Sequence, residues 1–189
     1  RMNRRKALKN LGVLSGGMIL LPSCDFSEEK VSLSLNKLRI TKSQENLMKE
    51  LVVTMIPDGE IPGAGKLMVH DFVWVMADDC LEASVQEAYL RGLANFEKDT
   101  KKLAGKSFLS LTQQDRIKTL KLIQDAKENA SEQVNTDLLT FVEYTKRFAI
   151  TGYMQSEYIM TEIMPYSLVP GTFGTCETID NSKRVNVNA

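Results

Sequence analysis

The residues best suited to chemistry in this chain of 189 residues are its single histidine and the carboxylates near it. His70 is followed directly by Asp71, and Asp78 and Asp79 come about two helical turns later. A histidine beside a carboxylate could act as a general base, because its ordinary pKa of about 6.5 permits proton transfer near neutral pH. The surrounding segment is apolar, so we favour a packed, hydrogen-bonded histidine, with Asp78 and Asp79 as a pair at a helix end.

Motifs that bind common cofactors are absent from the sequence. The string PGAGKL follows a predicted helix rather than a strand and lacks the spacing of a dinucleotide or phosphate loop. There is no CxxCH for haem attachment. Three cysteines and one histidine supply too few ligands for an iron–sulfur cluster or a zinc site. We therefore expect no cofactor, no metal and no catalysis in this chain by itself.

The first 24 residues have the pattern of a targeting segment for the export of folded proteins. Arg4 and Arg5 form a twin-arginine pair, and an apolar run over 11–21, interrupted by glycines, is too short for a transmembrane helix. The residues 21–24, LPSC, resemble a lipobox, which predicts lipidation of Cys24. An ordinary amphipathic N-terminal helix is the alternative. We expect a periplasmic protein anchored to a membrane by lipid.

The charge balance separates this leader from the body of the chain. Five basic residues and no acidic one lie in 1–23, so residues 24–189 carry 19 basic and 24 acidic residues. A body with a net charge of −5 lacks the electrostatic footprint of a nucleic-acid-binding protein. Its 166 residues suffice for one domain with a sizeable core.

Cys80 and Cys176 remain as an even pair if Cys24 carries lipid. Disulfides persist in an oxidising compartment, and closing so long a loop stabilises by about 4.7 kcal/mol in the chain-entropy model. We predict that the two cysteines form a disulfide. Two separate buried thiols are the alternative.

Helical periodicity dominates the body, and no succession of strands and turns is visible. Thr41 with Gln44 forms a capping box, Gly105 is suited to a helix C-cap, and Thr112 with Asp115 is suited to a helix start. The predicted fold is all-α, a bundle of about five helices over 41–56, 66–80, 83–104, 112–128 and 134–152. Because 66–80 is apolar almost all round, we expect it to be a buried central helix. Residues 25–40 are expected to be a tether, 41–176 the helical domain and 177–189 a polar tail.

The segment after the last helix combines aromatic residues and methionines with prolines and glycines. Tyrosine and methionine are favoured at protein interfaces because they are amphipathic or adaptable. Core packing of these residues in the same bundle is the alternative. We predict that the segment docks against a partner protein, through Tyr153, Met154, Glu157, Tyr158, Tyr166, Pro170 and Phe173.

Several strings, in this order, resemble the gluconate 2-dehydrogenase subunit 3 family. They are the stretch from Ile56-Pro57 through IPGAG at 61–65, the helix around Phe72, GLANFE at 92–97, GKSFLSLTQQD at 105–115, GYMQSEY at 152–158 and VPGTFGTC at 169–176. The chain departs from the family pattern at Gly59-Glu60, where the family more often has Thr-Asp.

The resemblance implies a small accessory subunit without its own cofactor. Its partner would be a flavoprotein similar to the glucose-methanol-choline class, which carries FAD and passes electrons to a cytochrome c subunit or domain with haem c. The small subunit would help the partner mature and carry it through the twin-arginine route. A lipid-anchored subunit with Cys80 and Cys176 looks most like the glucoside 3-dehydrogenase type.

Two readings from other classes compete with the accessory subunit. One is a self-sufficient periplasmic enzyme that uses His70 with Asp71 or Asp78. The other is a self-standing lipoprotein that binds a glycan or a protein and has no redox role. The twin-arginine segment argues against the latter, since a helical domain without a cofactor could use the general secretion route.

Overall fold

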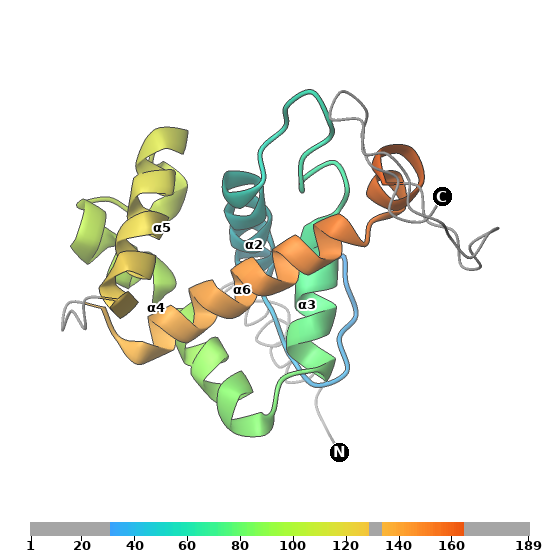
Figure 1. Cartoon of the computed structure of the whole chain (residues 1–189). Coiled ribbons are helices and arrows are strands. Elements are labelled where there is room, and N and C mark those ends of the chain that lie inside the picture. Colours follow the sequence, from blue (N-terminus) through green and yellow to red (C-terminus); the bar gives the residue numbers. More distant parts are fainter. Residues whose placement is uncertain (1–30, 129–133, 165–189) are drawn as a thin grey trace, which may run out of the picture. The chain divides into compact units, whose positions relative to one another are not determined.

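The computed structural model describes residues 31–128 and 134–164, and within them every regular element is helical (Figure 1). These residues form five α-helices, a 3-10 turn and a π-helical turn, which confirms the predicted all-α fold. The elements are α2 (Lys42–Met55), α3 (Val69–Asp79), α4 (Ala83–Ala104), η1 (Phe108–Ser110), α5 (Gln113–Glu128), α6 (Thr136–Met154) and η2 (Ile159–Ile163). No helix in this described part is long and apolar enough to cross a bilayer.

Helix α6 is the central element of the bundle. It packs against α2, α3, α4 and α5, and its most extensive contact is with α4 (Figure 1). The close approach of α4 depends on Gly92, because a Cβ at this position would overlap the backbone oxygen of Asp137 and lie 2.6 Å from the Cβ of Phe141. Arg91, the neighbour of that glycine, also binds Asp137, with 2.8 Å between Nε and Oδ2.

Local sequence signals set most of the helix ends. The Thr41 hydroxyl accepts from the Gln44 amide at 3.2 Å, and the Gln44 side chain accepts from the Thr41 amide at 2.9 Å. Gly105 ends α4 with φ 76°, a left-handed conformation that costs glycine little. Thr112 accepts from the Asp115 amide at 3.2 Å and so caps α5. The predicted capping box, C-cap and helix start are therefore confirmed.

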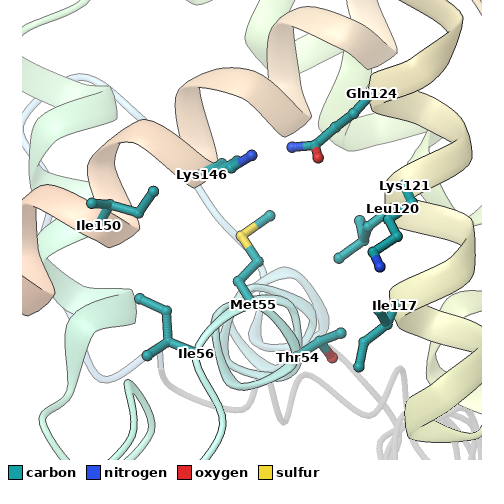
Figure 2. A pocket seen from close by; sticks show the side chains of 9 residues that line it. All are labelled: Thr54, Met55, Ile56, Ile117, Leu120, Lys121, Gln124, Lys146 and Ile150. Atoms are coloured by element: carbon teal, nitrogen blue, oxygen red, sulfur yellow. The ribbon is translucent and has the colours of Figure 1, made fainter.

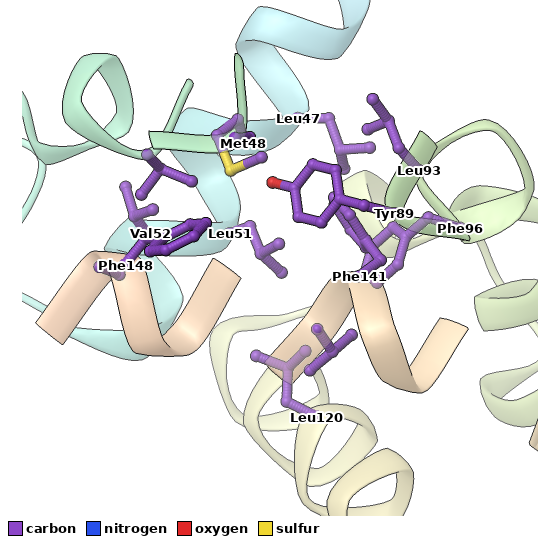
Figure 3. Close-up of a cluster of buried hydrophobic side chains, with 14 of the residues drawn as sticks. Leu47, Met48, Leu51, Val52, Tyr89, Leu93, Phe96, Leu120, Phe141 and Phe148 are labelled. Carbon is purple, nitrogen blue, oxygen red and sulfur yellow. The ribbon is translucent and has the colours of Figure 1, made fainter. Parts of the chain in front are cut away.

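The core is built around a cluster of aromatic rings. Phe141 of α6 lies edge-on to Tyr89, with 5.0 Å between ring centroids, and to Phe96, with 5.3 Å (Figure 3). Phe108 of η1 continues the cluster at 5.2 Å from Phe96. The fully buried Tyr89 hydroxyl lies 3.1 Å from the Thr145 hydroxyl, which satisfies its hydrogen bond. Burial raises the pKa of Tyr89, so the side chain is neutral under physiological conditions.

Residues 31–40, which we expected to belong to a tether, are fastened to the helical body. Asp78, only 1% exposed near the end of α3, accepts from the backbone amides of Asn36 at 2.6 Å, Lys37 at 3.0 Å and Leu38 at 2.7 Å. Leu38 is buried in the core. The body of this protein therefore includes residues from at least Val31 onward.

The carboxyl of Asp78 is held in its charged form. Burial raises the pKa of Asp78. The three backbone hydrogen bonds and the charge of Lys37 together lower it by more than burial raises it, so the net shift is downward. Asp78 is therefore more than the helix-end residue that the sequence predicted. It joins two segments about forty positions apart.

The predicted helix over 66–80 is shorter and less buried than expected. It begins at Val69, because residues 64–68 form turns, with backbone bonds from Leu67 to Gly63 and from Met68 to Gly65. Val75 is 40% exposed, so one side of α3 faces solvent. Helix α6, rather than α3, is the element that packs against each of the other four α-helices described.

Candidate docking surface

The loop over 56–68, between α2 and α3, has a fixed conformation. Asp58 accepts from the Gly63 amide at 2.7 Å, and this bond, with the neighbouring Lys66, lowers the pKa of the Asp58 carboxyl. A Cβ on Gly63 would lie 2.5 Å from the carbonyl carbon of Pro57. The buried Ala64 closes the loop by donating to Ile56 at 3.0 Å. Glycine is thus required where the loop folds back on itself.

The C-terminal end of α6 is fixed against this loop. The Tyr153 hydroxyl donates to the carbonyl oxygen of Pro62 at 2.9 Å. Burial, with the nearby Tyr158 and Asp58, raises the pKa of Tyr153, so the hydroxyl keeps the proton that it donates. Gly152 lies directly against Phe72 of α3, since a Cβ there would be 2.5 Å from Cδ1 of that ring.

A π-helical turn, η2, follows α6 after a short connection. Ser156 ends the helix by donating through its hydroxyl to the carbonyl of Tyr153 at 2.7 Å. Ile159, at 2% exposure, anchors the turn in the interior. The Met164 amide then donates to Ile159 at 2.7 Å, which closes the π-helical ring.

The loop and the segment over 156–162 line a groove of about 390 Å³, which we term the C-terminal groove. Met68 stands at its edge with 60% exposure and a left-handed φ of 51°, an uncommon conformation for a residue with a Cβ. An exposed methionine held in this way is an adaptable apolar contact. The groove is lined by Lys66, Leu67, Met68, Ser156, Glu157, Tyr158, Thr161 and Glu162.

The predicted interface residues fall into three groups. Glu157 and Tyr158 line the C-terminal groove, and Met154 is 41% exposed one turn earlier on α6. Tyr153 is half-buried, and its hydroxyl binds the carbonyl oxygen of Pro62, so it holds the loop in place and does not line the groove. The last group, Tyr166, Pro170 and Phe173, lies outside the described residues.

The sequence did not indicate Met68 and the neighbouring Leu67 as part of this surface. Both lie within the stretch that we expected to be a buried helix. The turn signals of PGAG shortly before them could have shifted the predicted helix start beyond these two residues. Their proximity to Tyr158 depends on tertiary packing, which no local pattern records.

His70, the strongest catalytic candidate in the sequence, is a packed residue. Its Nε2 lies 3.5 Å from an Asp71 carboxylate oxygen, and its Nδ1 is buried without a hydrogen-bond partner in the described structure. Burial lowers the pKa of His70, and Asp71 only partly offsets this. Asp78 is occupied by three backbone amides. His70 lines neither the C-terminal groove nor the α2–α5–α6 groove described below.

The remaining predicted sites are only partly within the described structure. Cys80 is exposed at the end of α3; its thiol donates to the Met76 sulfur at 3.8 Å and forms no disulfide within the described part of the chain. Its predicted partner Cys176, together with Arg4, Arg5 and Cys24, lies outside the described residues. Within 31–128 and 134–164, no three His, Cys, Asp or Glu side chains cluster so as to hold a metal ion.

Comparison with known proteins gives one match. The sequence model of the family described as gluconate 2-dehydrogenase subunit 3 matches residues 42–171, more than half of the chain. The match begins at the first residue of α2 and includes the loop, α6 and the π-helical turn. No curated protein and no solved structure matches the chain.

Proposed function

Because this chain belongs to the gluconate 2-dehydrogenase subunit 3 family, we propose that it is the small, non-catalytic subunit of a periplasmic sugar dehydrogenase complex. The family match over 42–171 carries this proposal. The catalytic partner would be an FAD-dependent flavoprotein of the glucose-methanol-choline class, and electrons would leave through a cytochrome c subunit or domain. The complex would oxidise a sugar or glycoside, with the 3-hydroxyl of a glucoside as the position we favour.

The C-terminal groove supports a role in assembly. Its residues come from the loop over 56–68 and from the segment over 156–162 that follows the central helix, and Ile159 anchors that segment in the interior. Met68 and Tyr158 offer adaptable and amphipathic contact area, and Glu157 supplies charge at the edge. A partner that binds this surface would contact the segment that directly follows α6.

The same subunit would export and anchor the complex. Arg4 and Arg5 would direct a folded assembly to the twin-arginine route, and Cys24 would attach it to a membrane through lipid. The partner would thereby reach the periplasm with FAD already bound. A disulfide between Cys80 and Cys176 would stabilise the small subunit there, and a mobility difference between reducing and non-reducing gels would detect it.

Affinity purification of the full chain from its native cells, followed by an absorption spectrum, tests the proposal. We expect a larger yellow protein to co-purify and to oxidise sugars with an artificial electron acceptor. Oxidation of glycosides at C3 would support the favoured substrate class, and its absence would exclude that class alone. A colourless single chain would refute the accessory role and would favour the self-standing lipoprotein.

Export is tested separately by localising the partner. Replacing Arg4 and Arg5 together by lysine should leave both subunits in the cytoplasm. Cys24→Ala should release the assembled complex from the membrane as a soluble species. Export of the partner in cells that lack this chain would contradict the escort role, even if the complex itself exists.

A further inference from the structure

A second cavity, distinct from the C-terminal groove, lies where the end of α2 meets α5 and α6 (Figure 2). We term it the α2–α5–α6 groove. Its floor is apolar and consists of Met55 and Ile56 at the end of α2, Ile117 of α5 and Ile150 of α6. Ile150 is 48% exposed, although it lies on the helix that forms the centre of the bundle.

The rim of this groove is positively charged. Lys121 of α5 and Lys146 of α6 stand at its edges (Figure 2), and the other lining residues are uncharged. Neither lysine forms an ion pair with any carboxylate in the described structure. An apolar floor between two lysines without ion-pair partners in the described structure is complementary to an apolar side chain that has carboxylates near it in its own chain.

The size of the groove limits what can enter it. Its volume is about 170 Å³. An apolar cavity of about 150 Å³ holds a benzene molecule, so this groove has room for one large side chain and not for a helix. A single anchor residue in a pocket, surrounded by a polar rim, is the usual arrangement of a binding hot spot.

The face of α6 that lines the groove continues toward the predicted interface. Met154, a predicted interface residue with 41% exposure, follows Ile150 by four positions on α6. Residues four apart lie on the same face of a helix. One partner could therefore contact the end of α6 and also reach the α2–α5–α6 groove.

We propose that the α2–α5–α6 groove receives one large apolar side chain, aromatic or leucine-like, from an acidic segment of the catalytic subunit. Carboxylates of that segment pair with Lys121 and Lys146, while the apolar side chain covers Ile150 and Met55. This inference rests on the proposed function, because it assigns a second contact point within the same complex.

Photo-cross-linking within the purified complex tests the position of the partner. A benzophenone amino acid replaces Gln124, which lines the groove, and in a matched variant it replaces Leu122, an exposed residue of the same helix that does not line it. We expect the probe at 124 to cross-link to the catalytic subunit, at a segment with Asp or Glu within four residues of a large apolar residue. The probe at 122 should give at least tenfold less product.

Charge substitution tests the chemistry of the contact. Ile150→Glu and Lys146→Glu should each accelerate dissociation of the complex at least tenfold, whereas Leu122→Glu should leave the rate within twofold. Circular dichroism of each variant verifies the helical fold. If Ile150→Glu unfolds the chain, Lys146→Glu and the cross-linking comparison still decide the question.

The outcomes separate this inference from the proposed function. An intact complex in which the probe at 124 labels nothing, or only a second copy of this chain, overturns the inference and leaves the proposed function standing. Unchanged dissociation of the Lys146→Glu and Ile150→Glu complexes overturns it as well. A chain that purifies without any dehydrogenase subunit refutes the proposed function and this inference with it.

Discussion

Replacement of Asp78 by alanine is the most informative perturbation of the fold. The carboxylate accepts from three backbone amides of residues 36–38, which join the N-terminal segment of the body to α3. Alanine removes all three acceptor contacts at once. It introduces no bulk, because the new side chain is smaller than the old one.

The magnitude follows from those three bonds. A hydrogen bond to a charged group contributes about 1.5–3 kcal/mol. Asn36 and Lys37 are exposed, so their amides can bind water after the substitution, whereas Leu38 is 5% exposed. We therefore expect Asp78→Ala to lower the free energy of unfolding by about 3 kcal/mol, less than the simple sum of the bonds. At about 2–4 °C per kcal/mol for a chain of this size, Tm should fall by roughly 6–12 °C.

Urea unfolding monitored by circular dichroism gives the free energy, with Asp79→Ala as the matched control. Asp79 is exposed, and its one described contact in this region is a 3.4 Å bond from the Asn36 side chain. Its replacement should change stability by less than about 0.5 kcal/mol. If Asp78→Ala were no more destabilising than Asp79→Ala, residues 31–40 would not be fastened through this carboxylate.

The same carboxyl predicts a pH dependence. Its pKa in the folded protein lies below its ordinary value of 3.8, so its contribution is fully present above that value and is lost as the pH falls through the folded pKa. The difference in stability between wild type and Asp78→Asn should therefore be constant from pH 5 to 7 and shrink below about pH 4. A difference that grows on acidification would contradict the downward pKa shift.

Two further substitutions test close contacts of α6. Gly92→Ala should lower the free energy of unfolding by about 1–3 kcal/mol, because the new Cβ would overlap the backbone of Asp137. Gly59→Ala is the control, since a Cβ there meets nothing within 4 Å. Equal changes in Tm for the two variants would argue against tight packing of α4 on α6. Tyr153→Phe should lower the free energy of unfolding by about 0.5–1.5 kcal/mol, because it removes the hydrogen bond to the loop over 56–68. Tyr144→Phe is the control. An unchanged stability of Tyr153→Phe would show that this bond does not hold the loop.

Local signals in the sequence were sufficient for most of the fold. The Thr41 capping box, the Gly105 C-cap and the Thr112 helix start each involve residues within four positions of one another, so their geometry depends little on distant parts of the chain. The start of α3 was predicted three residues early, because PGAG was treated as a connector that ends at Gly65. The turns through Met68 continue that connector.

The candidate surfaces could be predicted only in part. The abundance of Tyr and Met after α6 indicated an interface, and Met154, Glu157 and Tyr158 are accessible in the structure. The loop residues of the same groove, and the whole of the α2–α5–α6 groove, come from segments far apart in sequence. The packing of residues 31–40 was missed for the same reason, since Asp78 acts across about forty positions.

The position of α6 in the chain has a consequence for biogenesis. The helix that contacts α2, α3, α4 and α5 is the last of the five to be synthesised. The core around Phe141 is incomplete until α6 itself has been synthesised, although α2, α3, α4 and α5 precede it in the chain. Distant segments therefore close on a helix that is made after all of them. A chaperone that binds exposed apolar helices would have its longest opportunity on this subunit before α6 emerges.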